Sequence, residues 1–248
     1  MNSSEDFMRY KFLLMLLSPL IAFGQSFSPH EQFEVGDVVN YSVNVNGKTK
    51  PLEYTFNKVE KNLQSGKVIF DSKEGEFISQ GIGFESQDFG LTNGEMVIRK
   101  PDVKIFEPAM QVGAKWTNFF EAKGESFKAQ IIQQAQVEKF EKVKLKFVEV
   151  DCFLVSTNDT LQVVNAKSEV LSGKASNKIW VGVVNNRLLI VKREYQNSFG
   201  AKMVQELSDL PKISDVHKKL EKLKDLHKSG LINDAEYELK KKEILKTL

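Results

Sequence analysis

Between residues 35 and 207, apolar and polar residues alternate in short runs that turn signals interrupt. Such alternation is typical of strands with one buried face. Val38–Val45 alternates in this way and is followed by Asn46-Gly47, a dipeptide that favours a two-residue hairpin turn. The other predicted strands cover residues 52–59, 67–70, 96–99, 143–150, 177–184, 187–195 and 201–207, with turns predicted at Ser65-Gly66, Asn93-Gly94 and Asn185-Asn186. We expect a mainly β domain over residues 25–210, a curved antiparallel sheet or open barrel rather than a parallel α/β fold.

Three local features refine this prediction. Residues 125–139 have the composition of a helix, but Phe127, Ala129 and Ile131 would share one face of a strand, and we favour the strand. Val35-Gly36 and Val112-Gly113 open similar segments and predict two related halves. The single cysteine, Cys152, lies in an apolar run and is interpreted as a small buried side chain.

The last 36 residues change to a helical period, with apolar residues at steps of three and four. Gly230 provides a signal that ends the first helix, and Asn233 with Glu236 forms a capping box that begins the second. The predicted apolar, partner-binding face of this hairpin consists of Val216, Leu220, Leu223, Leu226, Ile232, Tyr237, Ile244 and Leu245. Two isolated helices of this length are marginal in water, so this face requires protein contact, either with a second copy or with the preceding domain of the same chain.

The pattern of leucines around Gly230 and Glu236-Tyr237, followed by Lys240-Lys241, resembles the SHOCT (short C-terminal) module over residues 213–246. The resemblance implies oligomerisation or partner binding, and for some members nucleic-acid binding has been suggested. Residues 212–248 contain ten lysines and seven acidic residues, a net charge of +3, and the two signs are interleaved. We therefore expect a protein partner, either a second copy or an envelope protein, and not a nucleic acid.

The body, residues 35–210, resembles the uncharacterised TapB-like exported bacterial β-proteins. The resemblance rests on Gly113-Ala-Lys-Trp116, Asp151-Cys-Phe153, Lys178-Ile-Trp180 and Ile190-Val-Lys-Arg-Glu194. It implies a curved antiparallel sheet and carries over no catalytic residue.

At the other end, residues 12–23 are apolar and follow Arg9 and Lys11, and Ala22-Phe23-Gly24 offers small residues for cleavage. This layout predicts a signal peptide over residues 1–24, because the run is too short for an ordinary spanning helix. An uncleaved membrane anchor is the alternative. With the SHOCT resemblance, the leader predicts a bacterial protein that is exported to the periplasm or secreted, with no transmembrane span after cleavage.

No catalytic constellation stands out in the sequence. His30 lies between the leader and the first predicted strand, and His217 and His227 lie on the predicted terminal helix without the spacing of helical metal sites, so we expect no metal and no cofactor. Carboxylate pairs such as Glu74 with Glu76, or Glu85 with Asp88, leave a hydrolase as one alternative.

Aromatic residues leave a second alternative, a carrier of a lipid or another apolar ligand. The candidate lining of an apolar pocket is Phe84, Phe89, Trp116, Phe119 and Phe120. The leading hypothesis is an exported, non-enzymatic envelope protein that binds or scaffolds through its β domain and uses the hairpin for oligomerisation or docking.

Overall fold

The computed structural model describes residues 32–60, 63–80, 84–90, 95–106, 111–213 and 216–245, with backbone alone at residues 80, 84–90 and 216–218. The predicted signal peptide lies outside the described residues. Within them, the strands are β1 (Val38–Val45), β2 (Lys48–Glu60), β3 (Leu63–Phe70), β4 (Lys73–Gln80), β5 (Phe84–Gly90), β6 (Glu95–Lys104), β7 (Lys115–Lys123), β8 (Phe127–Lys144), β9 (Glu149–Asn165), β10 (Val170–Val184), β11 (Arg187–Asn197) and β12 (Lys202–Leu207). The helices are α1 (Val216–Lys228) and α2 (Asp234–Leu245).

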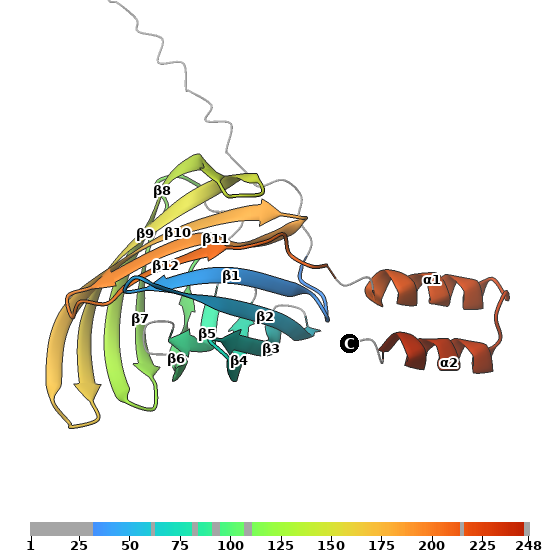
Figure 1. Cartoon of the computed structure of the whole chain (residues 1–248), viewed down its shortest axis with the longest axis horizontal. Coiled ribbons are helices and arrows are strands. Elements are labelled where there is room, and N and C mark those ends of the chain that lie inside the picture. Colours follow the sequence, from blue (N-terminus) through green and yellow to red (C-terminus); the bar gives the residue numbers. More distant parts are fainter. Residues whose placement is uncertain are drawn as a thin grey trace, which may run out of the picture.

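The strands follow one another in chain order around a closed antiparallel barrel (Figure 1). β1 closes it by pairing with β2 on one side and with β12 on the other, where Val43 lies opposite Gln205. Figure 1 shows long, bent strands β8 to β11 along one side of the barrel and the helical hairpin beyond its wall. The predicted mainly β architecture followed by two C-terminal helices is confirmed.

Local signals explain several of the elements. Asn46 and Gly47, with φ of 48° and 89°, form the predicted turn between β1 and β2. Asn185 and Asn186, with φ of 50° and 61°, form the turn between β10 and β11. Residues 125–139 lie mainly in β8, so the preference for a strand is confirmed.

Two predicted boundaries are wrong. The turn predicted at Ser65-Gly66 is wrong, because both residues lie inside β3, which begins at Leu63. Gly66 is needed there because a Cβ atom would collide with the backbone carbonyl oxygen of Thr55 in β2. Residues 143–150, predicted as one strand, contain the turn between β8 and β9, where the Leu145 N–H donates to the Val148 carbonyl at 2.8 Å.

The two segments predicted to begin related halves have the same backbone conformation and hydrogen-bond pattern. Gly36 and Gly113 adopt φ of 90° and 92°, a conformation that favours glycine. The Gly36 N–H donates to the Phe56 carbonyl at 2.7 Å, and the Gly113 N–H donates to the Val137 carbonyl at 2.8 Å. A register shift follows in each case, after Phe56 in β2 and after Val137 in β8. This correspondence supports two related halves that begin at β1 and at β7.

The middle of the long strands separates two apolar cores. Cys152 and Leu154 of β9 belong to the first core, and the intervening Phe153 and the following Val155 belong to the second. Successive residues of a strand point to opposite faces, so β9 is buried on both faces at this level. The first core is built mainly with β1 to β4, and the second mainly with β6 to β8.

Candidate functional site

The C-terminal hairpin has complete local signals at its turn. The Leu231 N–H donates to the Leu226 carbonyl and the Gly230 N–H to the His227 carbonyl, each at 3.0 Å, and Gly230 has a φ of 72°. These bonds form a Schellman motif, which satisfies the last carbonyls of α1. The turn therefore ends α1 through its own backbone, with no contribution from the barrel.

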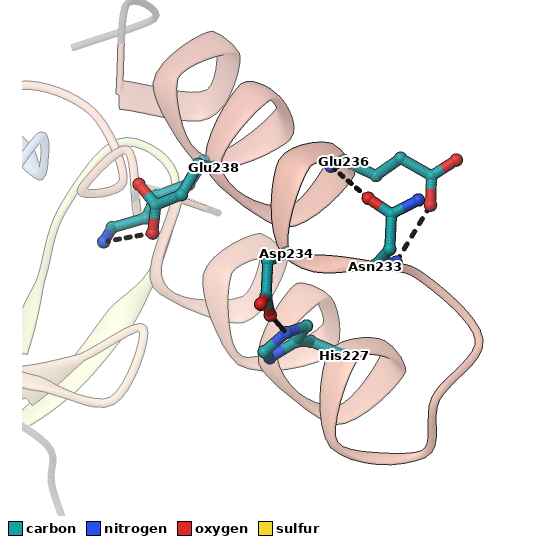
Figure 2. Close-up of polar contacts among 6 residues, drawn as sticks. His227, Asn233, Asp234, Glu236 and Glu238 are labelled. Atoms are coloured by element: carbon teal, nitrogen blue, oxygen red, sulfur yellow. Dashed lines mark hydrogen bonds and ion pairs between the residues drawn. The ribbon is translucent and has the colours of Figure 1, made fainter.

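The start of α2 is capped as predicted (Figure 2). The Glu236 N–H donates to Asn233 Oδ1 at 3.0 Å, and the Asn233 N–H donates to Glu236 Oε2 at 2.9 Å. This reciprocal pair is a capping box. Asp234 and Glu236 also place negative charge at the positive end of the α2 dipole.

A second set of contacts joins the two helices. His227 Nε2 lies 2.6 Å from Asp234 Oδ1 (Figure 2). The His227 ring also stacks on Tyr237 with centroids 4.6 Å apart. Lys241 Nζ lies 5.6 Å from the centroid of the Tyr237 ring, and it approaches Glu238 at 3.4 Å. The contacts of His227 link the end of α1 to the first turn of α2, and those of Lys241 lie within α2.

The packing of α1 on α2 covers part of the predicted apolar face and leaves another part exposed. Leu223 is buried, and Leu220, Leu226, Ile232, Tyr237 and Ile244 are half-buried. Leu245 is exposed, and the side chain of Val216 lies outside the described ones. Much of this face is therefore covered within the hairpin, and its predicted role in partner binding stays a prediction.

Other leucines of the hairpin remain accessible. Leu231 is 71% exposed, Leu239 59% and Leu245 43%. Leu239 and Leu245 line a shallow surface hollow on α2 together with Ala235. Within the described residues, α1 and α2 make their main tertiary contacts with each other rather than with a strand. The hairpin thus presents apolar side chains that the barrel does not cover.

The residues predicted to line an apolar pocket do not share one surface. Phe120 is buried in the second core, and Trp116 packs against that core and donates from Nε1 to the Lys104 carbonyl at 3.0 Å. Phe119 points to the opposite face of β7 and is exposed. The side chains of Phe84 and Phe89 lie outside the described ones.

The candidate acids and histidines are dispersed. Glu74 is exposed and pairs with Lys67 at 2.8 Å, and Glu76 is exposed on the same strand. The side chains of Glu85, Asp88 and His217, and the whole of His30, lie outside the described parts, whereas His227 lies in the hairpin. The described residues hold no group of three or more His, Cys, Asp or Glu side chains arranged to bind a metal ion.

Cys152 is fully buried between its neighbours in the first core. The pKa of its thiol is raised to about 12, mainly by burial and also by the nearby Asp151 and Glu141 carboxylates. A thiol with such a high pKa is protonated at neutral pH and is a poor nucleophile.

Three buried charged residues, the pair Asp37 and Arg187 and the separate Asp159, carry no clear signal in the sequence. Asp37 and Arg187 are buried and form an ion pair of 2.9 Å that joins the segment before β1 to the start of β11. Asp159 of β9 is 7% exposed and accepts from Gln133 and Asn177 through Oδ2, while Oδ1 has no hydrogen-bond partner among the described residues. Burial raises the pKa of Asp159 to about 6, against the opposing effects of hydrogen bonds from Thr157 and Gln133 and of the Arg193 charge.

Neither described helix is long and apolar enough to cross a membrane. A comparison with curated proteins found no match. Among solved structures, the chain is similar to the hypothetical lipoprotein YmcC from Escherichia coli (K12), at 11% identity, over 70% of this chain and 84% of that one, with a TM-score of 0.43. The resemblance of residues 35–210 to TapB-like proteins stays a prediction. The family model of the short C-terminal domain, SHOCT, matches residues 218–245, so the prediction of a SHOCT-like module is confirmed for the segment that forms the helical hairpin.

Proposed function

We propose that this chain is an exported, non-enzymatic protein of the bacterial envelope, which binds or scaffolds through its β domain and associates through its C-terminal hairpin. The observation that carries the proposal is the accessible set of leucines on a hairpin whose turn is already capped at the end of α1 and at the start of α2. A hairpin with a satisfied turn and uncovered leucines is suited to contact a second protein surface. A second copy of the chain or an envelope protein would both satisfy this requirement.

The export part of the proposal is supported by the apolar leader with its preceding basic residues and the small residues at the expected cleavage site. Expression of the full chain in a Gram-negative bacterium, followed by fractionation, tests it. We expect a mature protein outside the cytoplasm whose intact mass lacks about the first 24 residues. A cytoplasmic protein of full-length mass would contradict export.

The association part is tested by light scattering coupled to size exclusion. Leu239→Ser and Leu245→Ser change exposed positions of α2, so they should leave the hairpin folded. If self-association uses this surface, the double variant should have a lower average mass than the wild-type chain at equal concentration. Glu243→Gln, which changes an exposed polar residue of the same helix, is the matched control and should behave as wild type.

Identical masses for the wild-type chain and the double variant would exclude self-association through these leucines. In that case an envelope partner is tested by crosslinking in cells, with a photoreactive residue introduced at Leu239. A crosslink to another protein at this position, and none when the residue is placed at Glu53 on the exposed face of β2, would support docking.

A further inference from the structure

The outer face of strands β7 to β11 carries a row of uncharged polar side chains in register. Gln134 of β8 lies opposite Thr117 of β7 and Asn158 of β9. Ser176 of β10 lies opposite Asn158 and Gln196 of β11. Side chains of directly opposite residues are close neighbours on one face of a sheet. The five side chains therefore form a continuous band of amides and hydroxyls that crosses five strands.

A second row beside this band begins with an aromatic residue. Phe119 of β7 lies opposite Ile132 of β8, which lies opposite Thr160 of β9, and Thr160 lies opposite Lys174 of β10. Phe119 is 64% exposed and Ile132 is 46% exposed. The outer face thus places an accessible aromatic ring and an aliphatic side chain along one side of the polar band.

Residues of both rows line a hollow on the surface of the sheet. Its volume is about 660 Å³, and its lining includes Ile132, Gln134, Asn158, Thr160 and Ser176. Phe119 is not part of this lining, but it lies opposite Ile132, which is. A second hollow of about 590 Å³ is also lined by Ser176 and Gln196 and extends to β12 and β1. Because the two hollows share these residues, they form one elongated groove across the strands.

Part of the polar lining of this groove is not used within the protein, whereas Asn197 and Ser198, which also line it, accept hydrogen bonds. In the described part of the chain, no hydrogen bond engages the side chains of Gln134, Asn158, Thr160 or Gln196. Lys174 also lines the first hollow, and Lys178, Glu194 and Lys202 line the second, so charged side chains flank the uncharged band. A groove with unused amide and hydroxyl groups is therefore available on the outer face of β8 to β11.

We propose that this groove binds a glycan chain. Amides and hydroxyls both donate and accept hydrogen bonds, as sugar hydroxyl groups do, and the Phe119 ring offers a flat apolar surface for the C–H face of a pyranose ring. An open groove that crosses several strands suits an extended chain better than a small compact ligand. Asn158 and Gln196 bind hydroxyl groups along the chain, while Phe119 and Ile132 contact its less polar face.

This inference names a ligand for the β domain and rests on the envelope location proposed above. It does not depend on the hairpin, and the two proposals fail separately. Leu239→Ser, which tests association, should leave glycan binding unchanged because Leu239 lies outside the groove.

Isothermal titration of the mature full chain with chitohexaose, cellohexaose and maltohexaose tests the proposal. We expect at least one of these hexasaccharides to bind with a Kd of about 1 mM or tighter. Phe119→Ala and Asn158→Ala change exposed side chains and should each weaken binding about fivefold or more. Val170→Ala, at an exposed apolar position outside the groove, is the control and should bind as wild type.

Absence of binding with all three hexasaccharides, at the highest soluble concentrations, would overturn the proposal. Binding that neither Phe119→Ala nor Asn158→Ala weakens would also overturn it, because the glycan would then occupy another surface. Unchanged thermal unfolding of both variants should accompany their loss of binding, since exposed side chains contribute little to stability.

Discussion

At the scale of single residues, Asp159 shows how burial sets the charge of a group. Its carboxylate lies among Gln133, Thr157 and Asn177, and one of its oxygens has no partner among the described residues. Burial raises its pKa from 3.8 to about 6. Because the folded state holds the proton more tightly than the unfolded state does, ionisation of Asp159 lowers the stability as pH rises from about 4 to about 6.

Asp159→Asn should remove this effect. We expect the variant to be more stable than wild type at pH 7 by on the order of 2 kcal/mol, and the gain to disappear at pH 4. Urea unfolding at pH 4 to 8 measures the difference. Asp151→Asn, at an exposed position beside Lys142, is the matched control and should show no comparable gain. An equal stability difference at every pH would show that the charge of Asp159 is not its cause.

The buried ion pair is the second prediction at this scale. Asp37→Ala removes the carboxylate that lies 2.9 Å from the buried Arg187 guanidinium. Because the arginine charge stays buried, the variant should lose about 3–5 kcal/mol of unfolding free energy. Asp71→Asn removes the charge from an exposed pair with Lys50, keeps a residue type that tolerates the φ of 51° at this turn, and should cost about 1 kcal/mol or less. Urea unfolding of both variants gives the comparison, and equal costs would mean that the buried pair contributes no more than a surface contact.

At the scale of elements, strands and helices with strong local signals could be predicted, while those that depend on distant partners could not. The β-turn at Asn46-Gly47 and the capping box at Asn233 are each specified by a few neighbouring residues. The turn between β8 and β9 contains no glycine, proline or asparagine, and the alternation of Val143–Val150 continues through it. β9 extends through the polar stretch Ser156–Thr160 because β8 and β10 pair with it on both sides.

The candidate sites likewise divide into features with local sequence signals and features that depend on distant residues. The sequence predicted the hairpin and its capping residues, but the mutual packing of α1 and α2 decides which leucines remain exposed. Leu231 and Leu239 were therefore missed. The groove was also missed, because its band is formed by residues from five strands whose register is set by pairing across the whole sheet.

The capping box supports a prediction for α2. Asn233→Ala removes the acceptor of the Glu236 N–H and should destabilise the start of the helix by about 1 kcal/mol. Amide hydrogen exchange in Asp234–Leu245 should become about fivefold faster, measured by mass spectrometry on the full chain. Asn233→Ser keeps a capping oxygen and should retain most of the protection. Equal exchange in Asn233→Ala and wild type would show that the box does not hold the helix start.

At the scale of the whole molecule, the barrel is one sheet with two cores, and the long strands join them. β9 places Cys152 and Leu154 in the first core and Phe153 and Val155 in the second. Each core also contacts one of the two tryptophans. Trp180 belongs to the first core, and Trp116 packs against the second. A core that shares its strands with another cannot lose its packing without loosening the shared strands.

This arrangement predicts that the two cores unfold together. Phe153 is fully buried and contacts Phe140, with ring centroids 4.7 Å apart, so Phe153→Ala should cost about 3–5 kcal/mol. Fluorescence in the Trp116→Phe background reports the first core, and fluorescence in the Trp180→Phe background reports the second. If the barrel is one cooperative unit, Phe153→Ala lowers the urea midpoint equally in both backgrounds. Phe119→Ala, at an exposed position, should lower neither midpoint appreciably, and a shift confined to the Trp116 signal would mean that the halves unfold separately.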